Sequence, residues 1–222
     1  MKRLFEVCAG NVESVEAAAL GRAERIELCA SLEIDGLTPS LEMLKLVRER
    51  FPALKVHVLV RPRAGNFVYS RKEVDVMERD INEMLPWADG IVCGALTVDA
   101  DIDISTMRRL IHAADGKPFT FHRAFDVCRY PLMAIDQIID LGCDRLLTSG
   151  QQPTAEQGMD LLCQLQEYAA GTIVVMPGGG VNSGNARRIL DITKCHEIHG
   201  SASLGTRVTQ RAEVRRIIAS LE

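Results

Sequence analysis

The sequence has no C-x-x-C pair, no run of lysine or arginine, and no apolar stretch near the roughly 20 residues of a membrane helix. Its seven cysteines are scattered, so neither a disulfide framework nor a zinc knuckle is indicated, and reduced thiols are expected. A net charge of −4 without a basic run disfavours a nucleic-acid surface. Because linkers and low-complexity tracts are also missing, we expect a single domain over residues 1–222 that binds neither nucleic acid nor a membrane.

The N-terminus begins like a signal peptide but does not continue as one. Glu6 interrupts the apolar run of MKRLF, and Asn11 and Glu13 follow before any cleavage-like position. The chain has 222 residues, of which 47% are hydrophobic and 25% charged, so it can bury a sizeable core. We therefore expect a cytoplasmic protein whose partner is a small polar molecule.

A strand-like apolar run, a polar corner and an amphipathic helical run recur along the whole chain. The predicted strands are 4–8, 25–29, 55–60, 89–93, 118–122, 145–148, 172–176 and 195–199. The predicted helices are 12–20, 40–50, 70–85, 104–114, 131–141, 155–169, 182–191 and 212–221. Eight βα units in a chain of this length predict an α/β fold of the (β/α)8 TIM-barrel type. A doubly wound sheet is the alternative, although no G-x-G-x-x-G follows the first strand.

Two of the predicted helices begin with capping signals. Ser40 follows a proline and suits an N-cap position. Ser70 opens the sequence S-R-K-E, in which Glu73 completes a capping box. These signals define where the second and third helices start.

Polar residues and glycines collect at the C-terminal ends of the predicted strands, which share one rim in a barrel. They are Glu6, Cys8, Glu27, Cys29, Arg61, Arg63, His122, Arg123, Thr148, Ser149, Gly178, Gly179, Gly180, His199 and Ser201. Side chains alternate along a strand, so the members of this set on the first three strands are predicted to face the lumen. They are Glu6, Cys8, Glu27, Cys29, Arg61 and Arg63. Glu6 and Glu27 should then pair with Arg61 and Arg63. This set is either a structural ion network or part of a site.

The stretch PFTFHRAFD at 118–126 carries charged groups where the fifth strand must end. His122, Arg123 and Asp126 each need a partner or water there, which folding alone does not supply. Strand ends of this kind are where α/β proteins keep their sites. The stretch therefore favours a site at His122.

The glycine-rich segment MPGGGV at 176–181 lies between the seventh strand and its helix. Consecutive glycines let backbone N–H groups turn toward an anion, and the helix that follows adds its positive end. Phosphate sites in barrels are often built from the loops after strands seven and eight, where this chain has GGG and HGSAS. A tight turn without a ligand is the alternative.

Cys8 and Cys29 end adjacent strands at matching depth and can both offer sulfur to one soft ion. Two cysteines with His122 or His199 nearby would suit Cu(I). Because cysteine is among the most buried residue types, simple packing is the alternative.

Six segments together resemble the copper homeostasis protein CutC family over nearly the whole chain. They are EVCAGNVESVEAA, RIELCASLEIDGLTPS, VRPRAGNFVYS, FTFHRAFD, RLLTSG and VVMPGGGVN. The resemblance implies a cytoplasmic (β/α)8 barrel, often a homodimer, that takes part in copper handling by binding Cu(I). It also implies Cys8 and Cys29 as the copper ligands.

Two further functions are compatible with the same residues. One is a barrel enzyme acting on a phosphorylated or carboxylated small molecule, with His122 as general acid or base and Glu6 or Glu27 as its carboxylate counterpart. In it, the ligand is bound by Arg61, Arg63, Arg123, Thr148, Ser149, Gly178, Gly179, Gly180, His199 and Ser201. The other is a binding or scaffold protein that acts through a dimer face.

Overall fold

Each predicted βα unit forms in the computed structural model, which describes residues 2–222. Within that range the strands are β1 (Leu4–Ala9), β2 (Arg25–Leu28), β3 (Lys55–Leu59), β4 (Gly90–Cys93), β5 (Phe119–Phe121), β6 (Arg145–Thr148), β7 (Val174–Pro177) and β8 (Glu197–Gly200). The helices are α1 (Val12–Leu20), α2 (Leu41–Arg50), α3 (Arg71–Met84), α4 (Ile104–Ala113), α5 (Pro131–Asp140), α6 (Met159–Ala169), α7 (Ala186–Thr193) and α8 (Arg211–Leu221). Short 3-10 turns lie at Leu32–Ile34 and Arg123–Val127.

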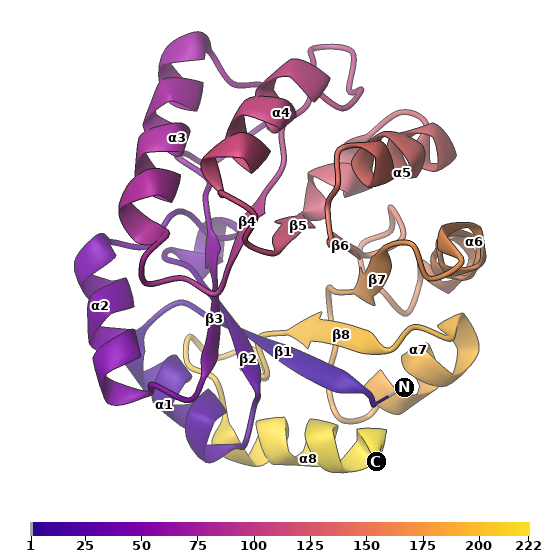
Figure 1. The fold of residues 1–222 in the computed structure, drawn as a ribbon. Helices are drawn as coiled ribbons and strands as arrows, with labels where there is room; N and C mark the ends of the chain where they lie inside the picture. Colours follow the sequence, from indigo (N-terminus) through magenta and orange to yellow (C-terminus); the bar gives the residue numbers. More distant parts are fainter. Residues whose placement is uncertain (1) are drawn as a thin grey trace.

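The strands are parallel and run in the order β7-β6-β5-β4-β3-β2-β1-β8. A bridge between Gly178 and His199 joins the two end strands and closes the ring. Figure 1 shows the helices arranged around the outside of this ring. The predicted (β/α)8 barrel is therefore confirmed.

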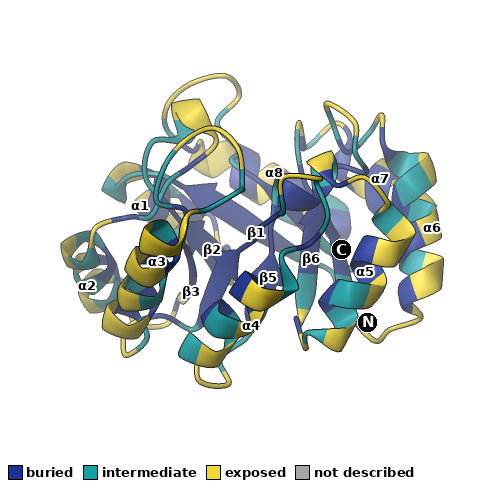
Figure 2. Ribbon diagram, turned by 90° about the horizontal axis from the view of Figure 1, so that it is seen from above, coloured by how far each residue is buried: buried dark blue, intermediate teal, exposed yellow. Residues whose placement is uncertain are grey.

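The core lies between the strands and the helices that surround them. Val7, Ile26 and Val58 are fully buried on the strands, and Val15 and Leu44 meet this layer from the helices. Viewed from above, the strands are buried and the outward faces of the helices are exposed (Figure 2). Among the helices of residues 2–222, none has the length and apolar character needed to cross a bilayer.

Local capping explains several helix starts. Ser40 accepts a hydrogen bond from the Met43 N–H at 3.1 Å, as predicted for an N-cap. Ser70 and Glu73 form the predicted capping box, in which each side chain accepts from the other residue's backbone N–H.

Two helices begin four residues later than predicted. Helix α6 starts at Met159 rather than at residue 155, because Gly150 and Gly158 pack backbone against backbone in the segment before it. Helix α7 starts at Ala186 rather than at residue 182, because Asn185 accepts from the Asn182 N–H and holds a turn there. The glycines at 178–180 are thus separated from the start of α7, so the expected contribution of that helix end to an anion site is weaker than predicted.

Candidate functional site

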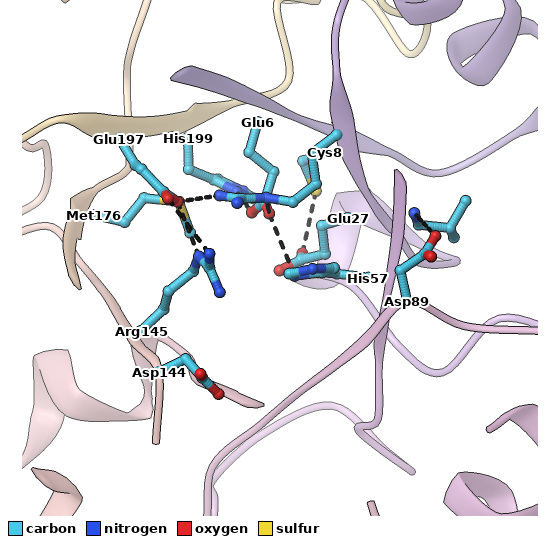
Figure 3. Close-up of polar contacts among 12 residues, drawn as sticks. Glu6, Cys8, Glu27, His57, Asp89, Asp144, Arg145, Met176, Glu197 and His199 are labelled. Atoms are coloured by element: carbon cyan, nitrogen blue, oxygen red, sulfur yellow. Dashed lines mark hydrogen bonds and ion pairs between the residues drawn. The ribbon is translucent and has the colours of Figure 1, made fainter. Parts of the chain in front are cut away.

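A buried ion network fills the middle of the barrel. Arg25 donates to Glu6 at 2.5 Å and also pairs with Glu197. Arg145 donates to Glu197 at 2.9 Å (Figure 3). The predicted pairing of Glu6 and Glu27 with Arg61 and Arg63 is wrong. The prediction fails because the register of the sheet places Arg25 directly beside Glu6, whereas Arg61 lies beyond the end of β3.

Glu6 is the centre of this network and is fully buried. Its second oxygen lies 2.8 Å from His199 Nδ1, and β8 brings His199 beside it in the sheet. Burial alone would raise the pKa of Glu6, but Arg25 and His199 hold that pKa well below its usual value. Glu6 is therefore a carboxylate that anchors the His199 ring.

Cys8, Glu27 and His199 form a cluster of possible metal ligands, with one donor atom of each within 4.8 Å of the others. Cys8 Sγ lies 3.5 Å from Glu27 Oε1 and 3.7 Å from Cys29 Sγ. We call these four residues the Cys8 cluster. All four are buried, and a dashed line in Figure 3 marks the contact between Cys8 and Glu27. Of the two histidines considered from the sequence, the structure brings His199 and not His122 to Cys8.

The pKa values of Cys8, Glu27 and His199 are all raised. The hydrogen bond with Cys29 and burial raise the pKa of the Cys8 thiol well above its usual value. Burial also raises the pKa of Glu27. Burial lowers the pKa of His199, but the neighbouring Glu27, Cys8 and Glu6 outweigh it and raise that pKa. A cation at this position would replace protons.

A cavity of about 470 Å³ opens above the Cys8 cluster. Besides Cys8, Glu27 and His199, it is lined by the predicted residues Arg61, His122, Arg123, Gly179, Gly180 and Ser201. The structure thus brings together residues from widely separated segments of the chain. A volume of this size suits a small-molecule ligand.

His122 is a buried residue of the cavity lining. Its Nδ1 accepts a hydrogen bond from the Ala124 N–H at 3.2 Å, so the proton of the neutral ring lies on Nε2. Burial and the nearby Arg61 lower the pKa of His122 to about 3. At neutral pH the ring is a hydrogen-bond donor, which disfavours the role of general acid or base.

Arg61 and Arg63 differ in position although both follow β3. Arg61 is buried against the cavity and donates to the carbonyls of Ile34, Gly36 and Gly65 at 3.0 Å each. Arg63 points away to Glu73 on α3, at 2.5 Å, and is not part of the cavity lining within residues 2–222. The prediction that Arg63 faces the lumen is wrong, because the chain leaves the sheet after Leu59 and no longer follows strand alternation.

Thr148, Ser149 and Gly178 were also predicted to bind the ligand, but their contacts are with other parts of the protein. Asp126 accepts from Arg123 at 2.7 Å, and the hydroxyls of Thr148 and Ser149 donate to it. Gly178 forms the bridge that closes the barrel. Thr148, Ser149 and Gly178 therefore stand behind the cavity wall in the described part of the chain.

The sequence did not indicate that Arg25, Arg145 and Glu197 belong to the ion network. Arg25 and Arg145 begin their predicted strands, away from the rim, and Glu197 lies in the middle of the predicted eighth strand, yet their long side chains meet in the barrel centre. Strand alternation on β8 would have indicated Glu197, because it lies two residues before His199 on the same face.

Comparison with known proteins identifies relatives over most of the chain. The model of the CutC family matches residues 3–204. A CutC family protein from Bacteroides thetaiotaomicron is 48% identical over 202 residues, which cover 90% of this chain and 81% of the relative. One from Bacteroides fragilis is 50% identical over 200 residues, covering 90% and 80% of the two chains.

A solved structure agrees with the sequence comparison. The crystal structure of a protein named copper homeostasis protein CutC, from Streptococcus agalactiae, superposes with a TM-score of 0.85 at 34% identity. The match covers 90% of this chain and 98% of that chain. The family match and the identity to these relatives agree, and this chain belongs to the CutC family.

Proposed function

We propose that this chain binds Cu(I) through the Cys8 cluster and takes part in copper handling. One observation carries the proposal: Cys8, Glu27 and His199 bring one donor atom each within 4.8 Å of the others, and the buried Cys29 sulfur lies 3.7 Å from that of Cys8. Thiolate and imidazole are donors that a soft ion prefers. The choice of copper is supported by the name of the Streptococcus agalactiae relative.

The residues present fit a metal ion. Among residues 2–222, Glu27 Oε2 is a buried oxygen without a hydrogen-bond partner, and a cation would supply one. Metal–sulfur bonds of about 2.3 Å can join sulfurs up to about 4.6 Å apart, so Cys8 and Cys29 reach one ion without strand movement. Glu6 orients His199 through Nδ1, as carboxylates do for metal-binding histidines.

The proposal implies a reducing compartment, because Cys8 and Cys29 must stay thiols to bind metal. We therefore propose the cytoplasm. The homodimer implied by the family resemblance stays a prediction, which light scattering on the purified protein tests.

The test is an anaerobic titration with Cu(I) in competition with a chromogenic chelator. The wild-type chain is expected to bind one Cu(I), and the double variant Cys8→Ser, Cys29→Ser is expected to lose it. Cys163→Ser is the matched control, because Cys163 lies on α6 away from the cluster. Equal Cu(I) affinity in the double variant and the wild type would contradict the proposal, and a parallel titration with zinc tests the preference for copper.

A second variant tests the role of the residue behind His199. Glu6→Gln leaves all four residues of the Cys8 cluster in place but weakens the hold on the His199 ring. Metal affinity is expected to fall about 10- to 100-fold, as for other residues that orient a ligand. Glu33→Gln, at an exposed position, is the control. Unchanged affinity in Glu6→Gln would contradict the role of the Glu6 carboxylate in orienting His199 for the ion.

A further inference from the structure

Two residues of the cavity lining each carry a buried nitrogen donor without a hydrogen-bond partner in the described part of the chain. Within residues 2–222, His122 Nε2 and Arg61 Nε have no hydrogen-bond partner. Their residues are only 5% and 4% exposed, and both line the cavity. A buried N–H without a partner is costly, so such groups indicate a molecule that accepts hydrogen bonds from them.

These two donors are held in fixed positions. The Phe67 ring lies 5.0 Å from the His122 ring and 5.0 Å from the Arg61 guanidinium. The Ala124 N–H fixes the His122 ring through Nδ1. Arg61 is held by three backbone carbonyls, which leave its positive charge without a carboxylate among these contacts. This wall of the cavity therefore favours a ligand with negative charge.

A second group of donors lies on the loop after β7. Gly179 and Gly180 have φ values of +103° and +70°, a conformation that turns consecutive N–H groups and forms anion-binding loops. A Cβ at Gly179 would lie 3.6 Å from Arg123 Nη1, so the guanidinium stands directly over the loop. Arg123 uses Nε for Asp126 and Nη2 for Ser149, which leaves Nη1 for a ligand. Loops after strand seven are where TIM barrels bind phosphate.

The rest of the lining combines apolar side chains with the carboxyl groups of Glu27, Asp35 and Asp126. Leu59, Leu147 and Val181 contribute side chains to the cavity wall. A carbon skeleton fits against such a wall, whereas a free inorganic ion would leave it uncovered.

We propose that the cavity binds a small phosphate monoester with a short carbon skeleton. Its phosphate lies against Gly179, Gly180 and Arg123, and a carbonyl or hydroxyl oxygen accepts from His122 Nε2 and Arg61 Nε. This binding goes beyond the proposed metal function and does not depend on it, because none of these five residues belongs to the Cys8 cluster. It gives the enzyme alternative a defined substrate class, with His122 as a neutral donor.

Calorimetric titration of the full chain with glycerol 3-phosphate at low ionic strength tests the proposal, with glycerol and glycerate as comparison probes. Saturable binding of glycerol 3-phosphate is expected, with glycerate weaker and glycerol not bound. Arg123→Gln and His122→Asn are each expected to weaken binding at least about tenfold. Asparagine retains an acceptor for the Ala124 N–H but does not reach the position of Nε2. Arg129→Gln is the control for charge, because Arg129 is exposed and pairs with Asp101.

The same titration on the Cys8→Ser, Cys29→Ser variant separates the two proposals, since phosphate binding should persist when metal binding is lost. Thermal melts verify that each variant is folded. The proposal is overturned by the lack of saturable glycerol 3-phosphate binding at millimolar concentration or by tighter binding of glycerate. Wild-type affinity in both Arg123→Gln and His122→Asn would overturn it as well.

Discussion

Replacing Arg25 with methionine removes a cation that pairs with both Glu6 and Glu197 and leaves His199 beside Glu6 and Arg145 beside Glu197. Glu6 is fully buried and Glu197 is largely buried, and both pair with Arg25. Methionine preserves much of the side-chain volume, so the main loss is electrostatic. Breaking a buried ion pair from one side costs about 3–5 kcal/mol, and we expect Arg25→Met to lower the free energy of unfolding by that amount at pH 7.

The effect should depend on pH. In the wild type the pKa of Glu6 is held well below its usual value, so its ionisation stabilises the fold above the unfolded pKa of about 4.5 and is lost as pH falls. Without Arg25, His199 and His57 oppose the effect of burial alone, so the pKa of Glu6 rises relative to the wild type and its ionisation stabilises the variant less. The difference between wild type and variant should therefore shrink from pH 7 to pH 4.

Urea denaturation followed by circular dichroism measures both quantities. The double variant Glu6→Gln, Arg25→Met should recover part of the lost stability, since it leaves no unpaired Glu6 carboxylate. A loss below about 1 kcal/mol at pH 7, or an equal loss at the two pH values, would refute the reasoning.

Two further predictions concern local structure, and the same denaturation assay measures both. Ser70→Ala removes the capping box of α3 and should cost about 1 kcal/mol, whereas Ser105→Ala, at an exposed position inside α4, should cost nothing measurable; equal effects would contradict the capping role. Gly150→Ala should destabilise far more than Gly142→Ala. Both glycines have positive φ, but a Cβ at Gly150 would lie 2.3 Å from the Gly158 carbonyl oxygen, whereas one at Gly142 would meet nothing within 4 Å. Similar losses would show that strain in φ, and not the close approach, sets the cost.

The Cys8 cluster and the anion-binding wall share one cavity but use different chemistry. One end offers thiol, carboxyl and imidazole groups, and the other offers N–H donors and guanidinium charge. Metal binding alone would leave the His122 and Arg61 donors unexplained. The two proposals together give a role to the Cys8 cluster and to the His122 and Arg61 donors.

The sequence by itself determined the architecture, because the signals for it are local. The alternation of apolar runs and amphipathic helices predicted each βα unit, and Ser70 with Glu73 predicted a helix start to within one residue. Strand alternation was enough to place Cys8, Glu27 and Cys29 on one side of adjacent strands.

Only the tertiary structure decided which of the rim residues are partners. Closure of the barrel places β8 beside β1, which brings His199 to Glu6. The register of β2 against β1 makes Arg25, and not Arg61, the partner of Glu6. The starts of α6 and α7 likewise depend on contacts that the periodicity of a helix does not encode. The physical reason is that periodicity specifies which face a side chain occupies, whereas strand register and ring closure specify what it meets there.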